Sequence, residues 1–193
     1  MDQFSTQFII ITVPKGIVFR KFSSMINLVE HVGETYTAAS YPPHVTLRTG
    51  AIVPIKEIDS FISKFEHHIC DWNSFDMETD GIINEEYTKH GEQKFFIYYH
   101  IRENCALNQL NRHLLEFTPF IKSQKKTFCP HLSLAYKDLS QRGYEKIRDL
   151  IASKSQLFPE KIKWRCDNVS LFYWKNFKWV PYHVFHSVDS IKS

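Results

Sequence analysis

Two short segments of the chain repeat one pattern of residue types that could carry acid–base chemistry. The segment YPPHVTL spans Tyr41 to Leu47, and FCPHLSL spans Phe128 to Leu134. Each reads aromatic residue, any residue, proline, histidine, apolar residue, hydroxyl residue, leucine. In an extended strand, residues i and i+2 project from the same face, so each histidine shares its face with the hydroxyl that follows it. The proline before each histidine removes a backbone donor and stiffens the start of the strand.

If the two segments face each other, two imidazoles and two hydroxyls surround one cleft that fits a phosphate group. A neutral histidine can take a proton from an attacking water, and a protonated one can give a proton to the departing oxygen. Hydrogen bonds and proton transfer stabilise the negative charge of the phosphate and of the departing oxygen, so this chemistry requires no metal or cofactor. We therefore predict His44 and His131 as catalytic residues and Thr46 and Ser133 as phosphate-binding residues. The sequence leaves open which histidine is the acid.

The elements that must position these residues follow from apolar spacing. A continuous apolar run from Gln7 to Val13 predicts a buried strand, and helical spacing predicts a helix from Arg20 to Val32. Asn104 and Ser140 are expected to cap the starts of two later helices. The remaining strands and helices are expected, in chain order, at 44–49, 54–69, 75–83, 94–101, 104–117, 131–136, 140–151, 161–174 and 178–188.

The order strand, helix, motif strand, helix, strand occurs twice in the chain. His44 and His131 lie 87 residues apart, and so do Phe8 and Phe95 in the opening strands. This spacing predicts an internal duplication. We expect one α+β domain over residues 1–193 with two lobes, about 1–88 and 89–193. The stretch from Ile83 to Lys94 is expected to cross between the lobes.

With its paired His-Φ-Ser/Thr-Φ segments (Φ is an apolar residue) in a duplicated α+β chain, the sequence resembles the 2H phosphoesterase superfamily. The resemblance in the order of elements covers nearly the whole chain. The sharpest match is PHLSLAYKDLS, from Pro130 to Ser140, which is similar to the cyclic phosphodiesterase branch. Relatives include bacterial 2′-5′ RNA ligases and 2′,5′-oligoadenylate phosphodiesterases. The resemblance implies two lobes of antiparallel sheet flanked by helices around a central cleft. It places His44 with Thr46 in the first motif and His131 with Ser133 in the second.

Two further residues are candidates for phosphate contact. The resemblance implies that Tyr136 corresponds to a tyrosine that contacts the phosphate region in the cyclic phosphodiesterase branch. Strict alternation from His131, however, would turn the Tyr136 side chain away from the cleft. Arg48, in HVTLRTG, departs from the family pattern. It follows Thr46 by two residues, so alternation places it in the cleft, where its guanidinium could bind phosphate. The alternative is an arginine at the strand end that reaches solvent.

Aromatic residues supply candidates for base stacking. The stretch LFYWKNFKWVPYHVFH, from Leu171 to His186, interleaves aromatic side chains with lysines. Such a surface can stack bases and hold a nucleic acid backbone, which makes Trp174 and Trp179 candidates. Tyr41, at the start of the first motif, is a candidate for the cleft wall. The alternative for the stretch is a hairpin with one face in the core, and for Tyr41 it is ordinary packing.

Composition limits the class of protein. Of 193 residues, 43% are hydrophobic and 15% aromatic, which indicates a packed core rather than disorder. A net charge of +3 suits a small anionic ligand but is too weak for the basic stripe of a duplex DNA-binding protein. No apolar run reaches the roughly 18–20 residues that span a bilayer, so no membrane partner is expected. Four widely spaced cysteines without a CxxC argue against zinc and predict reduced thiols in a cytoplasmic protein, which we expect to be a monomer.

The leading hypothesis is a metal-independent hydrolase of 2′,3′-cyclic phosphates on nucleotides or RNA ends, or of ADP-ribose 1″,2″-cyclic phosphate, with a 2′-phosphate as the product. A second interpretation is a 2′,5′-phosphodiesterase that cleaves 2′-5′ oligoadenylate or cyclic oligonucleotide signals, for which the cleft must be longer. A third is an RNA-binding module without turnover, although a pure binder does not need two proton-transfer groups.

Overall fold

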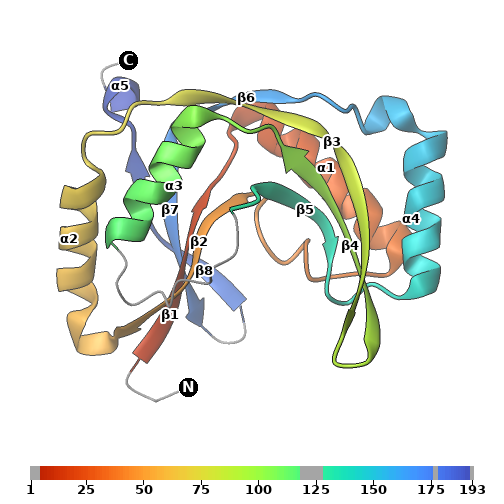
Figure 1. Ribbon diagram of the computed structural model, residues 1–193, viewed down its shortest axis with the longest axis horizontal. Helices are drawn as coiled ribbons and strands as arrows, with labels where there is room; N and C mark the ends of the chain where they lie inside the picture. Colours follow the sequence, from red (N-terminus) through yellow and green to blue (C-terminus); the bar gives the residue numbers. More distant parts are fainter. Residues whose placement is uncertain (1–4, 118–127, 176–177, 192–193) are drawn as a thin grey trace.

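The computed structural model of the chain describes residues 5–117, 128–175 and 178–191. Its elements are, in order, β1 (Ser5–Thr12), α1 (Gly16–Gly33), β2 (Val45–Pro54), α2 (Ile58–Ile69), β3 (Phe75–Lys89), β4 (Glu92–Ile101), α3 (Cys105–Phe117), β5 (His131–Tyr136), α4 (Gln141–Ser153), β6 (Lys163–Cys166), β7 (Asn168–Lys175), β8 (Lys178–His186) and α5 (Val188–Ile191). Two four-stranded antiparallel sheets form the centre of the molecule, with strand orders β2-β1-β7-β8 and β5-β4-β3-β6 (Figure 1). The predicted α+β fold is confirmed.

The two halves of the chain exchange strands. β3 comes from the first half but pairs with β4 in the second sheet. β7 comes from the second half but pairs with β1 in the first sheet, where Phe8 lies opposite Tyr173. The two sheets therefore do not divide the chain at one point near residue 88. This exchange joins the halves through main-chain hydrogen bonds rather than through a linker.

The stretch from Ile83 to Lys94 does not cross between the lobes as expected. It forms the two arms of the β3–β4 hairpin, which projects from the body of the molecule (Figure 1), and Lys89 lies opposite Glu92 at its tip. His90 and Gly91 form the turn, and their φ angles of 53° and 80° are both positive. Two consecutive residues with positive φ are what a tight two-residue hairpin turn requires, because that turn matches the twist of its strands. The His-Gly pair is the turn signal that the apolar pattern did not reveal.

β1 is buried on both faces, which explains its continuous apolar run. Phe8 and Ile10 pack into the main core. Ile9 and Ile11 project from the opposite face and pack with Phe172 of β7. A strand covered on both faces has no polar face, so its sequence does not alternate.

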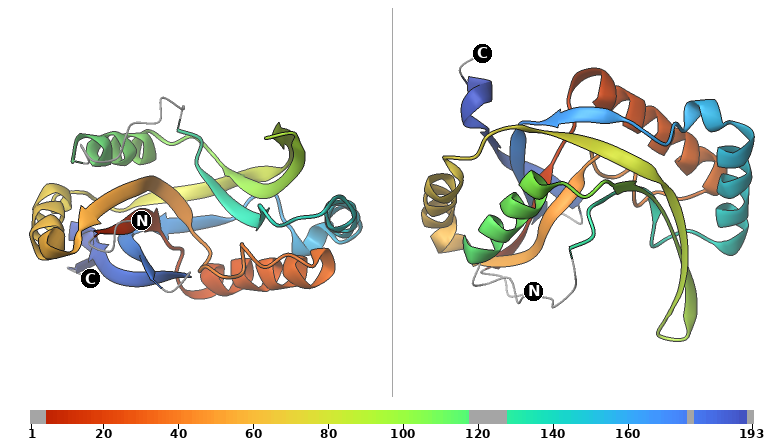
Figure 2. Two further views of the ribbon diagram at one scale, coloured as in Figure 1. Left: turned by 90° about the horizontal axis from the view of Figure 1, so that it is seen from below. Right: turned by 45° about the horizontal axis from the view of Figure 1, so that its top comes forward.

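Helices pack in pairs at the two ends of the molecule, α2 with α3 and α1 with α4 (Figure 2). Both predicted N-caps are confirmed: Ser140 Oγ accepts a hydrogen bond from the Gly143 amide at 3.1 Å, and Asn104 Oδ1 accepts one from the Ala106 amide at 2.8 Å. α1 and α4 approach closely at two glycines. A Cβ on Gly143 would lie 2.4 Å from the carbonyl oxygen of Gly33. The absence of a side chain at residue 143 therefore sets the spacing of this helix pair.

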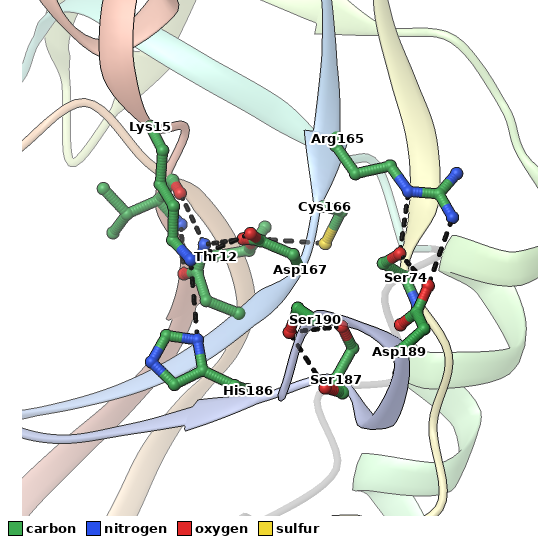
Figure 3. Close-up of polar contacts among 12 residues, drawn as sticks. Thr12, Lys15, Ser74, Arg165, Cys166, Asp167, His186, Ser187, Asp189 and Ser190 are labelled. Carbon is green, nitrogen blue, oxygen red and sulfur yellow. Dashed lines mark hydrogen bonds and ion pairs between the residues drawn. The ribbon is translucent and has the colours of Figure 1, made fainter. Parts of the chain in front are cut away.

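The strand expected over residues 161–174 is divided at Asp167, where the chain passes from the second sheet to the first. Lys15 Nζ forms an ion pair of 2.8 Å with Asp167 and lies 3.5 Å from His186 Nδ1 (Figure 3). Asn168 accepts a hydrogen bond from the Val13 amide at 3.0 Å and donates one to the Val13 carbonyl at 2.7 Å. The change of sheet is therefore fixed by side chains at the end of β1, which no local pattern in the 161–174 segment indicates.

The end of the described chain is bound back onto the second sheet. Asp189, in α5, accepts a hydrogen bond from the Ser74 amide at 2.9 Å and a short one from the Ser74 hydroxyl (Figure 3). Arg165 of β6 lies 3.4 Å from the same carboxylate. These hydrogen bonds from Ser74 hold the pKa of Asp189 well below its usual range. The cluster ties α5 to β6 and to the segment that precedes β3.

Candidate active site

The two motif strands lie side by side at the edges of the two sheets. β2 is the edge strand of the first sheet, β5 is the edge strand of the second, and the two are in contact. Between them lies a cavity of about 530 Å³. Both motif histidines and both motif hydroxyls line it: His44, Thr46, His131 and Ser133. Two segments 87 residues apart in the sequence therefore contribute to one cavity.

Each histidine is held by the backbone of its own motif in the same way. His44 Nδ1 lies 2.8 Å from the carbonyl oxygen of Pro42, and His131 Nδ1 lies 2.9 Å from that of Cys129. A carbonyl can only accept, so Nδ1 of each ring carries the proton. In a neutral ring, Nε2 is then an acceptor, and in a protonated ring it is a donor. Neither role requires a change in the Nδ1 hydrogen bond.

The two imidazoles differ in their electrostatic surroundings. Burial lowers the pKa of His44, and the nearby His131 lowers it further against the opposing effect of the Pro42 carbonyl. Burial also lowers the pKa of His131, but the Cys129 carbonyl and the Glu85 carboxylate both act to raise it. His100, opposite His131 in the β4–β5 pairing, acts to lower it. His131 therefore has a carboxylate that favours its protonated form, and no carboxylate acts on His44 among the described residues.

Thr46 and Ser133 present hydroxyls to the cavity beside the two rings. Within the part of the chain that the structure describes, neither hydroxyl has a hydrogen-bond partner. A hydroxyl without a protein partner is free to donate to a ligand oxygen. The pairing of residues i and i+2 that the alternation predicts holds in both motifs.

β2 bulges directly after Thr46. Ile11 of β1 lies opposite Thr46, but its neighbour Ile10 lies opposite Arg48, so Leu47 is an extra residue in the pairing. An extra residue of this kind reverses the faces of the residues that follow it, here as far as the second irregularity of β2, where Gly50 is extra. Arg48 is therefore turned away from the cavity.

β5 carries the corresponding bulge. Consecutive residues of β4 lie opposite Ser133 and Ala135, so Leu134 is the extra residue. Leu47 and Leu134 hold the same position in the repeated motif, three residues after the histidine. The duplication therefore extends to an irregularity of the backbone, and in both strands it moves the residue five positions after the histidine onto the cavity face.

The hypothesis that Arg48 binds phosphate is not supported by its position. Its Nη2 donates to the backbone carbonyl of Asn111 at 3.0 Å and to the side-chain oxygen of Asn111 at 2.8 Å. Arg48 does not line the cavity, and neither does it simply reach solvent. The bulge at Leu47 is the physical reason, because strict alternation from Thr46 fails there.

Tyr136 lines the cavity, and so does Thr49, its counterpart in the first motif. Strict alternation from His131 would have turned Tyr136 away, but the bulge at Leu134 brings it to the cavity face. Sequence reasoning missed Thr49, although it follows His44 by the same five residues as Tyr136 follows His131. That shared spacing is the signal that could have revealed it.

The three expected stacking residues form one wall of the cavity in two layers. Tyr41 and Trp179 line the cavity, and the ring of Tyr41 lies 5.7 Å from that of His44. Trp174 does not line it but packs edge-on against Trp179, with 5.3 Å between the ring centroids. Burial raises the pKa of Tyr41, partly opposed by a hydrogen bond from the Trp179 side chain. Trp174 therefore supports the wall rather than forming its surface.

Lys137 is a second residue that the sequence analysis did not single out. It lines the cavity next to Tyr136 and is the one lysine or arginine among the described lining residues.

A larger and more open hollow, of about 690 Å³, lies between α3 and the segment before β3 and contains none of the motif residues. No cluster of three or more potential metal ligands occurs in residues 5–117, 128–175 and 178–191. None of the helices in these ranges combines the length and apolar character that a membrane crossing needs.

Comparisons with known proteins agree with this fold. Residues 24–176 match the family model described as the 2′-5′ RNA ligase superfamily. Escherichia coli LigT, in a crystal structure with 3′-AMP, aligns with a TM-score of 0.61 at 11% identity, over 95% of this chain and 99% of LigT. The protein TT0787 of Thermus thermophilus aligns with a TM-score of 0.62 at 13% identity, over 93% and 97% of the two chains. Usb1 of Kluyveromyces marxianus aligns with a TM-score of 0.50 at 14% identity, over 91% and 96%. A sequence search of curated proteins found no match.

Proposed function

We propose that this chain, which belongs to the 2′-5′ RNA ligase superfamily, is a phosphodiesterase that opens 2′,3′-cyclic phosphates by two-histidine acid–base catalysis. The substrates would be nucleotides or RNA ends that carry the cyclic phosphate, or ADP-ribose 1″,2″-cyclic phosphate. The LigT relative has been crystallised with 3′-AMP, ATP and NADP⁺, so a nucleotide ligand is consistent with the family.

The observation that carries the proposal is the matched anchoring of the two imidazoles at one cavity. His44 and His131 each use Nδ1 on a carbonyl two residues earlier, and each lines the space between β2 and β5. In the proposed step, water attacks phosphorus and gives its proton to one Nε2, while the bond from phosphorus to O3′ breaks. The other Nε2 gives its proton to O3′, and the product is a 2′-phosphate. Thr46 and Ser133 donate hydrogen bonds to the non-bridging oxygens.

The electrostatic difference between the rings favours one assignment of roles. We infer that His44 is the base, because burial and His131 both favour its neutral form. His131 is the acid, because Glu85 favours its protonated form. Tyr136 and Thr49 contact the phosphate region from the two strands, and Tyr41 and Trp179 receive the base.

The test is turnover of 2′,3′-cyclic nucleotides in EDTA by the wild type and by His44→Ala and His131→Ala. We expect the wild type to retain its activity in the chelator and each variant to lose about 10²–10⁴-fold in kcat. His67→Ala, an exposed histidine of α2, is the matched control and is expected to behave as the wild type. Wild-type turnover in either motif variant would contradict the mechanism.

The second candidate is cleavage of linear 2′-5′ oligoadenylate or of a cyclic oligonucleotide. The aromatic wall of Tyr41 and Trp179, supported by Trp174, favours it because a stacking platform serves more than one base. The same assay with 2′-5′ oligoadenylate and cyclic dinucleotides distinguishes the two functions. Binding of these ligands without turnover of any would instead support an RNA-binding module.

A further inference from the structure

We propose that Lys137 binds a second phosphate of the substrate, separate from the one that reacts between the histidines. The preferred substrate is then a cyclic phosphate that also carries a 5′-phosphate, as in an RNA end, or a diphosphate, as in ADP-ribose 1″,2″-cyclic phosphate. This inference rests on the proposed function and adds to it a feature that distinguishes among its substrates.

The position of the side chain is the first observation. Lys137 lines the same cavity as His131 and Ser133, directly after Tyr136. Its Nζ lies over the Tyr136 ring, 4.9 Å from the centroid. A cation over an aromatic face is held in place without losing its positive charge. The ammonium group is therefore kept beside a residue that borders the phosphate region.

The backbone at Lys137 is the second observation. Its φ of 70° is a left-handed value, which costs free energy in any residue with a Cβ and is usually met by glycine or asparagine. The turn is fixed by Asp138, which accepts hydrogen bonds from Thr35 Oγ1 at 2.6 Å, from the Tyr36 amide at 2.6 Å and from the Thr37 amide at 3.1 Å. Lys137 is exposed, but the anchored turn fixes the direction in which its side chain leaves the backbone, and the Tyr136 ring contacts its ammonium group.

The balance of charge is the third observation. Among the described residues that line the cavity, Lys137 is the one permanent cation, and none is a carboxylate. The Asp138 carboxylate is occupied by Thr35 and by two backbone amides. Within the ranges that the structure describes, no carboxylate lies at ion-pair distance from Lys137 Nζ. The positive charge is therefore available to an anionic group of a ligand.

The reacting phosphate does not account for this cation. Two hydroxyls and two imidazoles already surround that group, and it carries a single negative charge as a cyclic diester. In a nucleotide with a terminal 2′,3′-cyclic phosphate, any other phosphate is attached on the 5′ side. The group that Lys137 would bind is therefore a 5′-phosphate or the equivalent phosphate that links a preceding nucleotide.

The experiment compares two substrates in two proteins. The kcat/KM for adenosine 2′,3′-cyclic phosphate and for its 5′-phosphorylated form is measured with the wild type and with Lys137→Met, which keeps the apolar stem. We expect the wild type to prefer the 5′-phosphorylated substrate by about tenfold, the size of a charge-assisted hydrogen bond. Lys137→Met should bring the ratio close to one, and Lys137→Arg should restore most of it.

Lys175→Met is the matched control, because Lys175 also lies over a tyrosine, with Nζ 5.9 Å from the Tyr173 centroid, but does not line the cavity. It should keep the wild-type ratio. A wild-type ratio near one, or a preference that survives in Lys137→Met, would overturn the inference. Binding of adenosine 2′,5′-bisphosphate and of adenosine 2′-phosphate, followed by calorimetry, tests the same contact without turnover. Failure of the proposed function therefore remains distinguishable from failure of this inference.

Discussion

The side-chain amide of Asn111 donates a hydrogen bond of 2.7 Å to the carbonyl oxygen of Leu47, the residue that bulges out of β2. The bulge removes this carbonyl from regular strand pairing, and α3 supplies the missing donor. The side-chain oxygen of the same asparagine accepts from Arg48 Nη2 at 2.8 Å. One buried side chain from the second half of the chain therefore satisfies two polar groups of the first motif strand.

Replacement of Asn111 should destabilise the protein through these groups. Asn111→Ala leaves the Leu47 carbonyl without its donor and removes one of the two acceptors of Arg48 Nη2, the other being the backbone carbonyl of residue 111. We expect the free energy of unfolding to fall by about 2–3 kcal/mol. Urea denaturation measures the change. Gln109→Ala, an exposed position of the same helix, is the control and should change stability little. An Asn111→Ala variant as stable as this control would show that water satisfies the bulge equally well.

The role of each histidine can be read from the pH dependence of a Glu85 variant. The Glu85 carboxylate raises the pKa of His131, so Glu85→Gln should lower that pKa. If His131 is the acid, it must be protonated, and the alkaline limb of the kcat/KM profile should move to lower pH while the acidic limb stays. Glu86→Gln is the matched control, because Glu86 acts on Tyr144 instead. A shift of the acidic limb alone would reverse the assignment of acid and base.

Asp138 should contribute stability that depends on pH. Burial acts to raise its pKa, but the hydrogen bonds from Thr35, Tyr36 and Thr37 outweigh it and hold the pKa below the usual value. A group whose pKa is depressed in the folded state stabilises that state above its unfolded pKa and loses this effect as pH falls through the folded pKa. We expect Asp138→Asn to lower the free energy of unfolding by about 1–2 kcal/mol at pH 7.

The difference in the free energy of unfolding between Asp138→Asn and the wild type should become smaller in acid, because the wild-type carboxyl becomes protonated. Denaturation at pH 7 and near pH 3 measures it. Asp149→Asn, which replaces an exposed carboxylate of α4, is the control and should change the free energy of unfolding little at either pH. An Asp138→Asn difference that is the same at both pH values would argue against the role of its charge.

Because α1 and α4 approach closely, we expect two glycine substitutions to lower the free energy of unfolding by different amounts. Gly143→Ala would place a Cβ 2.4 Å from the Gly33 carbonyl oxygen, which is backbone and can move only with its helix. Gly33→Ala would meet Ile147 Cδ1 at 2.4 Å, the flexible end of a side chain. We expect losses of about 3 kcal/mol and about 1 kcal/mol, respectively, in the free energy of unfolding. Equal losses in thermal or urea denaturation would contradict this difference.

That each motif histidine shares a strand face with its hydroxyl could be predicted, because this arrangement is local. Residues i and i+2 share a strand face, and this holds in both motifs up to the hydroxyl. The next two residues could not be placed, because a bulge is stabilised by a distant partner such as Asn111. Arg48 was therefore predicted on the wrong face, and Thr49 was missed.

The fold was predictable in its elements but not in their pairing. Apolar spacing located the helices and most of the strands, and their capping residues followed from Asn104 and Ser140. The break at Asp167 depends on Lys15 and the end of β1, more than 150 residues away along the chain. Which strand joins which sheet is decided by such long-range contacts, and apolar alternation contains no information about them.

The exchange of strands also bears on how the molecule is made. β1 needs β7 as its neighbour, and Phe8 finds Tyr173 only after 165 further residues have been synthesised. Long loops must then close before the first sheet can form, and proteins dominated by such distant pairings fold slowly. During translation, Ile9 and Ile11 therefore emerge from the ribosome long before Phe172, the β7 residue that packs against them, has been added to the chain.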